Sequence, residues 1–315
     1  YWAGEYAILE PGQLALIKAI PIYMTAEIES SEVYRLYSDM FTYSVDMRPD
    51  SSYALIQETV ALVEEYLASQ GVDLRPFSID IRGKMEREGK KFGLGSSGSV
   101  VVLVIKAMLA FYERPVERDL LFKLASAVLL KRGDNGSMGD IACIVSEDLV
   151  LYQSFDREKV AEWLDKEDLP TVLARDWGFS IRNVEPALDF DFLVGWTKEV
   201  AVSSHMVKQI KKNMNASFLQ ASKETVTNLV KALEAGQEDK IIDLLEQASQ
   251  LLEGLSSDIY THSLRQLKNA SHDLKAVAKS SGAGGGDCGI ALSFDQDSTT
   301  LLKKRWADLG IELLY

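Results

Sequence analysis

The spacing of apolar and polar residues predicts a chain that mixes strands and helices. Short runs that are apolar throughout, or that alternate between apolar and polar side chains, are typical of strands. On this basis we expect strands at residues 14–18, 22–29, 33–38, 77–81, 141–145, 149–153, 190–196, 290–294 and 311–315.

Helices are predicted where apolar residues recur at helical spacing. Such a stripe runs through residues 53–69 and is followed by Gly71, which can end a helix. The apolar run at residues 100–112 is too long for one strand, so we expect a buried helix that begins near Ser97. Further helices are expected from Pro115 onward and at residues 206–233, 240–252, 263–278 and 299–308. Because strands and helices do not alternate strictly, the predicted fold class is α+β.

Length and composition narrow the classes of protein. The 315 residues are enough for two domains of about 150 residues each. We take the charged stretch 156–186 as their boundary, which gives domains 1–185 and 186–315. A net charge of −13 argues against a general nucleic-acid-binding surface. Two separated cysteines, Cys143 and Cys288, indicate neither a disulfide framework nor a zinc site and fit a reducing cytoplasm. The sequence shows no signal peptide and no apolar run of membrane-spanning length.

The stretch KKFGLGSSGSV at residues 90–100 carries the strongest chemical signal. Its glycines let the backbone approach a ligand closely, and the helix behind it offers unpaired N–H groups that suit phosphate. Gly93, Gly95 and Gly98 also fit the G-x-G-x-x-G fingerprint of dinucleotide-binding proteins. That fingerprint needs a preceding apolar strand, whereas residues 84–91 are highly charged, so the context argues against it. A Walker A lysine and a G-x-S-x-G nucleophile elbow are also absent.

Two further loops are rich in glycine and polar side chains. One reads KRGDNGSMGD at residues 131–140, and the other reads SSGAGGGDCG at residues 280–289. A single Gly-Ser cluster is commonly a plain turn, but three separated loops of this kind are harder to explain in that way.

Together these loops resemble the motifs of the GHMP small-molecule kinases, and the resemblance covers essentially the whole chain. The first family motif ends in a Gly-Glu pair, present at Gly4 and Glu5; the second is the ATP loop G-L-G-S-S at residues 93–97; the third is the glycine-rich loop at residues 282–286. Tyr6, where galactokinase and mevalonate kinase usually have histidine, and SGAGGGDCGIAL at residues 281–292 are most similar to the phosphomevalonate kinase branch of Gram-positive bacteria.

The resemblance implies a two-domain fold with the active site between the domains. The N-terminal domain would be an α/β domain of the ribosomal protein S5 domain 2-like type, and the C-terminal domain would be α+β and ferredoxin-like. It further implies an ATP-dependent kinase that transfers the γ-phosphoryl group to (R)-5-phosphomevalonate. The product would be 5-diphosphomevalonate, in the mevalonate pathway of isoprenoid biosynthesis.

The family motifs also imply roles for particular residues. The ATP phosphates would be bound by Gly93, Leu94, Gly95, Ser96, Ser97 and Gly98. Ser97 would approach Mg²⁺, the cofactor that accompanies ATP, and would take part in catalysis, although in isolation it could equally be a helix N-cap. Asp140 matches the catalytic aspartate and could orient the acceptor or take its proton. Because a phosphate acceptor is already mostly anionic near pH 7, the role as a base stays open.

Two charged groups of the family cannot be matched in this sequence. A lysine that neutralises the transferring phosphoryl group is expected just upstream of the stretch that begins at Tyr1. The Mg²⁺-binding glutamate of galactokinase and mevalonate kinase would fall at residues 127–130, which read AVLL. The metal shell would then be made from water, phosphates and Ser97.

An acceptor that carries a phosphate and a carboxylate needs cations and hydrogen-bond donors. We expect them from the residues beside the matched motifs, which are Lys91, Arg132, Ser137, Lys198, Ser203, Ser204, His205, Gly284 and Gly285. The plainer interpretations are that each lysine is solvated surface and that Ser203 or Ser204 caps a helix.

Two alternative functions stay open. One is another GHMP kinase such as mevalonate kinase, whose acceptor needs fewer cations. The other is a catalytically inactive member of the fold that binds nucleotide and ligand and signals to a partner. For the leading function the expected partners are ATP and phosphomevalonate, with no nucleic acid and no membrane, for a cytoplasmic monomer or homodimer.

Overall fold

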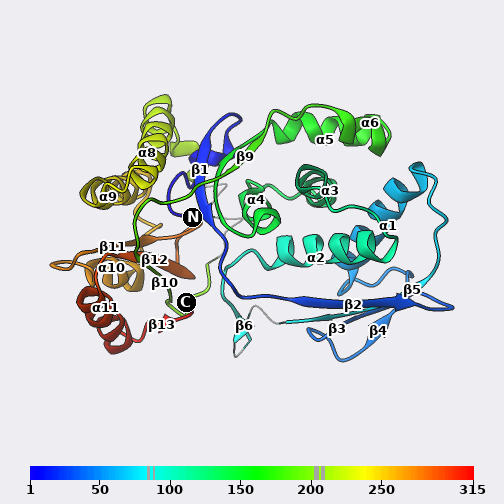
Figure 1. Ribbon diagram of the computed structural model, residues 1–315, viewed down its shortest axis with the longest axis horizontal. Coiled ribbons are helices and arrows are strands. Elements are labelled where there is room, and N and C mark those ends of the chain that lie inside the picture. The colour runs from blue at the N-terminus through cyan, green and yellow to red at the C-terminus, as the bar shows by residue number, and fades with distance from the viewer. Residues whose placement is uncertain (84–85, 88, 202–205, 207–209) are drawn as a thin grey trace.

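The computed structural model describes residues 1–83, 86–87, 89–201, 206 and 210–315. Its elements fall into two groups that lie side by side, and strand β1 (Leu14–Lys18) lies near the middle of the molecule (Figure 1). Strands and helices are mixed in both groups, as the α+β prediction requires.

The first group is built on a four-stranded sheet that helices cover on one face. The strand order is β2 (Thr25–Ser30), β5 (Phe77–Arg82), β3 (Arg35–Ser38) and β4 (Ser44–Val45), and only β3 and β5 pair in parallel among these strands. Phe77, Ile79 and Ile81 of β5 are fully buried and alternate with partly exposed residues. This alternation buries one face of the sheet against helices α1 (Ala54–Ser69) and α2 (Ser96–Phe111), as Figure 1 shows.

Further helices complete this group. They are α3 (Arg118–Lys131), α4 (Gly139–Ser146), α5 (Arg157–Lys166) and α6 (Leu169–Ala174). A second sheet joins β1 to β8 (Leu149–Gln153) and β9 (Ser180–Asn183). The short hairpin of β6 (Glu86–Arg87) and β7 (Lys90–Lys91) leads directly into the first glycine loop.

The second group is an antiparallel sheet with helices on both faces (Figure 1). Its strand order is β11 (Ala276–Ser280), β12 (Cys288–Ser293), β10 (Asp191–Trp196) and β13 (Glu312–Leu313). One face packs on α8 (Ala216–Glu234) and α9 (Glu238–Leu255). The other face packs on α10 (His262–Asn269) and α11 (Gln296–Asp308). A short 3₁₀ turn, η2 (Lys211–Asn213), precedes α8.

The first nine residues connect the two groups. The N–H of Trp2 donates to the carbonyl of Leu16 in β1 at 2.8 Å, while the Trp2 ring stacks against Phe192 of β10 with centroids 5.4 Å apart. The turn η1 (Ala7–Leu9) follows, and the side chains of Tyr6 and Leu9 are buried in a cluster with residues of the second group. The segment therefore belongs to both cores.

Two sequence predictions of secondary structure were wrong in type or extent. Residues 141–145, predicted as a strand, form α4, because Ile141, Ala142 and Cys143 are buried where α4 packs against α2, α3 and β8. The helix predicted at residues 263–278 ends at Asn269, and Asp273 takes a positive φ before β11 pairs with β12. In the charged stretch 156–186, for which no element was predicted, the structure has α5, α6 and β9.

The helix predicted at residues 206–233 is interrupted in the structure. Met206 and Ile210 are helical and residues 211–213 form η2, but Met214 and Asn215 have extended backbone. Helix α8 starts at Ala216, where Asn215 accepts a hydrogen bond from the N–H of Phe218 and caps the helix. Residues 207–209 of that prediction lie outside the described part of the chain. The domain boundary predicted at residue 185 falls between β9 and β10 and stays a prediction.

Candidate active site

A cleft of about 410 Å³ lies where the two groups of elements meet. All three glycine loops contribute to its wall, through Gly93 and Gly95, Asp140, and Ser281 with Gly282. The rest of the lining is largely apolar and comes from residues 17–24, from one side of α2 and α4, and from β10 and β12.

The first glycine loop ends in an uncapped helix N-terminus. Gly95 is the N-cap of α2 with a φ of 76°, a conformation that favours glycine, and within the described chain no side chain caps the helix. The first N–H groups of α2 therefore have no partner within the helix and add to the positive end of its dipole. Ser97 is exposed in this first turn, so the predicted helix start near Ser97 is confirmed.

Asp140 stands in the first turn of α4 and its carboxylate lies against this loop. A Cβ on Gly98 would come within 2.8 Å of Oδ2 of Asp140, and a Cβ on Gly95 would come within 3.0 Å of its Cβ. Burial raises the pKa of the Asp140 carboxyl from 3.8 to about 6, and the negative charge of Asp134 acts in the same direction.

Ser137 is held beside Asp140 by two tyrosines. Its hydroxyl lies 2.6 Å from the hydroxyl of Tyr1 and accepts a hydrogen bond from the N–H of Gly139 at 3.1 Å. Its carbonyl accepts a hydrogen bond from the hydroxyl of Tyr152 at 3.0 Å. Burial and the nearby Asp140 carboxylate raise the pKa of the Tyr1 phenol well above its ordinary value. Tyr1 therefore stays protonated and can donate a hydrogen bond.

The third glycine loop touches the cleft at one edge only. Ser281 and Gly282 line the cleft, whereas Gly284 and Gly285 are absent from its described lining. The N–H of Gly285 donates to the carbonyl of Ile259 at 2.8 Å, and a Cβ on Gly284 would come within 2.5 Å of that carbonyl oxygen. The expected contact of Gly284 and Gly285 with substrate is thus not supported, because close packing against the protein accounts for both glycines.

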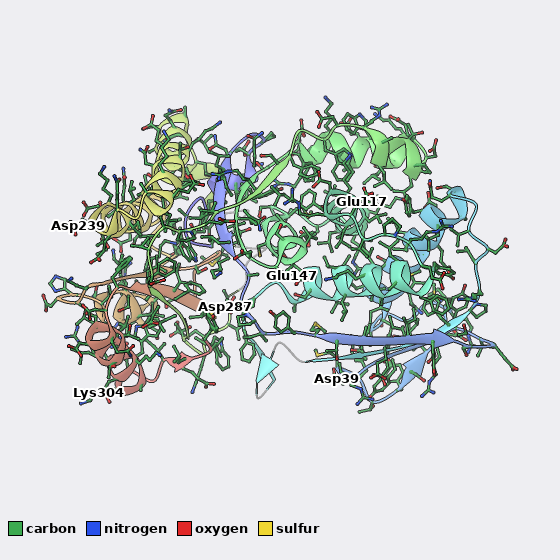
Figure 2. All side chains as sticks on the ribbon, in the orientation of Figure 1. Asp39, Glu117, Glu147, Asp239, Asp287 and Lys304 are labelled. Carbon is green, nitrogen blue, oxygen red and sulfur yellow. The ribbon has the colours of Figure 1, made fainter. Side chains whose placement is uncertain are left out.

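Asp287 joins the third loop to the first, a contact that sequence reasoning missed. Its carboxylate packs against Gly93, where a side chain would collide with it, and it accepts a hydrogen bond from the N–H of Ala201 at 3.2 Å. Figure 2 shows Asp287 between the two groups of elements. The neighbouring Cys288 donates from its Sγ to the carbonyl oxygen of Phe92 at 3.2 Å, so the start of β12 also contacts the first loop.

The cations expected around the acceptor fall in several places. Arg132 pairs with Glu58 of α1 and lines a surface hollow away from the cleft, because its side chain turns toward α1 as α3 ends. The structure therefore does not bring Arg132 to the cleft, and its expected role stays a prediction. Lys198 pairs with Glu312 of β13 at 3.2 Å and is not part of the described cleft lining. The backbone of Lys91 lies in β7, but its side chain is outside the described structure.

Ser203, Ser204 and His205 lie outside the described residues. The cations that the structure does bring into the cleft wall are Lys18 and Lys106, which the sequence analysis did not single out. Lys106 pairs with Glu147 at 2.6 Å, and Lys18 pairs with Asp148 at 3.3 Å. The only signal in the sequence that could have pointed to these two lysines was their position, Lys18 on one face of β1 and Lys106 on one face of α2.

Comparison with known proteins identifies both halves of the chain. Residues 54–147 match the family model described as the GHMP kinases N terminal domain, and residues 229–312 match the GHMP kinases C terminal model. Within the part of the chain that the structure describes, no helix is long and apolar enough to cross a membrane.

Solved structures and curated proteins agree with this family. The structure of Streptococcus pneumoniae phosphomevalonate kinase in complex with phosphomevalonate and AMPPNP is 74% identical, with a TM-score of 0.98, and the match covers 100% of this chain and 96% of that one. A curated phosphomevalonate kinase of Streptomyces sp. is 28% identical over 98% of this chain and 92% of its own length. The Methanococcus jannaschii mevalonate kinase structure, at 19% identity and a TM-score of 0.75 over 99% of this chain and 93% of that one, shares the fold.

Proposed function

The chain belongs to the GHMP kinases, and on that premise we propose that it transfers the γ-phosphoryl group of ATP to (R)-5-phosphomevalonate, giving 5-diphosphomevalonate. The observation that carries this proposal is the 74% identity over the whole chain to an enzyme whose structure holds phosphomevalonate and an ATP analogue. The cleft supports it, because its wall combines a phosphate-suited helix N-terminus with a half-buried carboxylate.

The first glycine loop is the proposed site of the ATP phosphates. Phosphoryl transfer depends on positioning and on neutralising negative charge, and the unpartnered N–H groups at the start of α2 provide both. The apolar lining from Ile20, Pro21, Met24 and Val102 is suited to the adenine ring. Lys106, in the same wall, adds a positive charge near the nucleotide.

Asp140 is proposed to orient the acceptor. Its carboxyl is held against Gly95 and Gly98, so it stands beside the position proposed for the γ-phosphate. With a pKa of about 6 it is mostly ionised near pH 7.5, as is the acceptor phosphate, whose second pKa is also roughly 6. Positive charge is therefore needed more than a base. Lys91 is proposed to supply part of it. Ser137, which Tyr1 and Tyr152 fix, is proposed as a hydrogen-bond donor to the acceptor.

Mg²⁺ is proposed as the companion of ATP, and the donors present fit it. The Asp140 carboxylate and the Ser97 hydroxyl are oxygen ligands of the type that Mg²⁺ takes. Among the described residues no group of three or more His, Cys, Asp or Glu could hold a metal, so most ligands would be phosphates and water. When bound, Mg²⁺ would neutralise charge on the β- and γ-phosphates. A role in the mevalonate pathway, a cytoplasmic location and a monomeric or homodimeric state complete the proposal and rest on the family alone.

The test is ADP release from the full-length protein with Mg²⁺ and ATP, with phosphomevalonate, mevalonate, galactose and homoserine compared as acceptors. Turnover with phosphomevalonate alone is expected. Turnover with another acceptor would keep the family and overturn the substrate. Tight nucleotide binding without turnover of any acceptor would favour an inactive ligand sensor.

A further inference from the structure

Tyr6 adopts a backbone conformation that non-glycine residues rarely take. Its φ is 62° and its ψ is −52°, and the N–H of Ala7 donates to the carbonyl of Glu5 at 2.7 Å. These values describe a γ-turn with positive φ, which is strained for a residue with a side chain. Glycine would relieve the strain, so the tyrosine side chain must supply something that offsets it.

The side chain of Tyr6 reaches the third glycine loop. The Tyr6 hydroxyl donates to the carbonyl oxygen of Ala283 at 2.5 Å, and the ring is 4% exposed in a cluster with Leu255, Ile259 and Tyr260. Burial raises the pKa of the phenol far above its ordinary value, so the hydroxyl keeps its proton and remains a donor.

Two neighbours of Tyr6 hold the same loop at other points. Glu5 forms a buried ion pair with Lys279 at 2.5 Å, and the Lys279 ammonium also donates to the carbonyl of Ser280 at 2.6 Å. The main chain of Tyr1 exchanges two hydrogen bonds with the Ser281 hydroxyl, at 2.8 and 3.0 Å. Residues 1–6 therefore hold residues 279–283 through three separate contacts.

The part of the loop that Tyr6 holds is also the part that meets the cleft. Gly282 lines the cleft and Ala283 follows it directly. Among the described residues, the N–H groups of Gly282 and Ala283 have no hydrogen-bond acceptor, whereas the N–H of Gly285 donates to the carbonyl of Ile259. Free amides in a glycine-rich loop are suited to an anionic oxygen, such as one of a phosphate or a carboxylate.

We propose that Tyr6 is a positioning residue, which fixes the backbone of residues 282 and 283 so that their amides bind an anionic oxygen of a substrate in the cleft. The inference deepens the proposed function and rests on it for the identity of the substrates. The inference also assigns a structural role to the first family motif, Gly4-Glu5. The motif would hold the third glycine loop in position, although it does not itself line the described cleft.

The test compares Tyr6→Phe with Tyr112→Phe in the full-length protein. Tyr112 is a matched control, because its half-buried hydroxyl also donates to a backbone carbonyl, that of Arg75 at 3.0 Å, and it lies outside the cleft lining. Loss of one hydrogen bond corresponds to about a three- to tenfold effect. Y6F is expected to lower kcat/KM by that factor, and Y112F to leave kcat and KM unchanged, with a similar loss of thermal stability in both.

The kinetic constants also identify the oxygen that the amides bind. A rise in KM for phosphomevalonate assigns them to the acceptor, a rise in KM for ATP assigns them to the nucleotide, and either supports the proposal. Unchanged constants in Y6F, or equal losses in both variants, would overturn it. Amide hydrogen exchange of residues 281–288 in the free protein gives a second readout. Faster exchange in Y6F than in Y112F supports positioning even if phosphomevalonate is not turned over, and equal exchange contradicts it.

Discussion

The carboxylate of Asp140 lies directly on the backbone of Gly98, so close that a Cβ on this glycine would come within 2.8 Å of Oδ2. Gly98 is in the first turn of α2 and Asp140 is in the first turn of α4, so two helix N-termini meet at this contact. The loop proposed to bind phosphate and the acid proposed to orient the acceptor therefore hold each other in place. A substitution that displaces the loop is therefore expected to displace the carboxylate of Asp140 as well.

Gly98→Ala is expected to reduce activity while leaving the helix intact. Alanine is the better helix former by about 0.5–1 kcal/mol, so the helix itself gains stability. The new methyl group would displace Asp140, and misplacement of a reacting group by less than 1 Å costs up to about a hundredfold in rate. We expect kcat/KM to fall between about tenfold and a hundredfold, measured by steady-state ADP release.

Gly254→Ala is the matched control for this substitution. Gly254 also lies in a helix, α9, but a Cβ there meets no atom within 4 Å. This variant should keep wild-type kinetics and gain slightly in thermal stability. Equal activity of G98A and the wild type would show that Asp140 tolerates displacement.

Asp140→Asn is expected to stabilise the protein without nucleotide near pH 7.5. Because the folded-state pKa is raised from 3.8 to about 6, the folded protein retains a proton that the unfolded chain loses. Wild-type stability therefore falls as the pH rises from about 4 to 6, and stays lower above that range. A full shift of this size corresponds to about 3 kcal/mol, and partial exposure of the side chain reduces it to about 1–3 kcal/mol.

Urea unfolding at pH 3.5 and pH 7.5 tests this prediction. Wild type and D140N should be equally stable at the lower pH and should differ at the higher one. A variant that is less stable than the wild type at both values would mean that the ionised carboxylate is stabilised in the fold. Kinase activity of D140N should fall whichever outcome is found for stability.

The buried pair of Glu5 and Lys279 is expected to show strong coupling. Both side chains are at most 3% exposed, so removing one charge leaves the other buried without a partner. We expect Glu5→Gln and Lys279→Met each to cost about 3–5 kcal/mol of stability, and the double variant to cost clearly less than the sum. A double-mutant cycle by urea unfolding measures the difference. Additive losses would contradict a direct interaction.

Arg132→Ala is expected to leave both substrates unaffected. Arg132 pairs with Glu58 on a partly exposed surface, where an ion pair contributes about 0–1 kcal/mol, and its hollow is separate from the cleft. Lys106→Ala, which removes a cation from the cleft wall, should instead raise KM for ATP. Steady-state kinetics of the two variants side by side would reveal any role of Arg132 in binding the acceptor.

Sequence patterns predicted correctly those features that depend on interactions between residues close together in the chain. The first glycine loop and the helix behind it were predicted because a run of glycine and serine before an uninterrupted apolar stretch leaves few other structures. Residues 141–145 were predicted wrongly because a five-residue apolar run fits a strand and a buried helix equally well. Only packing against α2, α3 and β8 decides between them.

The direction of a side chain and contacts between distant residues could not be predicted in this way. Arg132 follows the end of α3 beside the Asp140 loop in sequence, yet its guanidinium turns toward α1. Asp287 packs on Gly93, and Tyr6 reaches Ala283, across about 190 and 280 positions. The periodicity of apolar residues along the sequence does not indicate such contacts. These contacts bring the loops together.

The first nine residues pack against both groups of elements, and this bears on how the chain folds during synthesis. Trp2 stacks on Phe192, and Tyr6 is buried beside Ile259, so these residues pack against partners that the ribosome makes about 190 and 250 residues later. Until those partners emerge, the apolar side chains of this segment stay uncovered in the nascent chain and can be bound by chaperones. The cleft wall includes Ser281, Gly282 and Tyr315, so it can be complete only after nearly the whole chain has been synthesised.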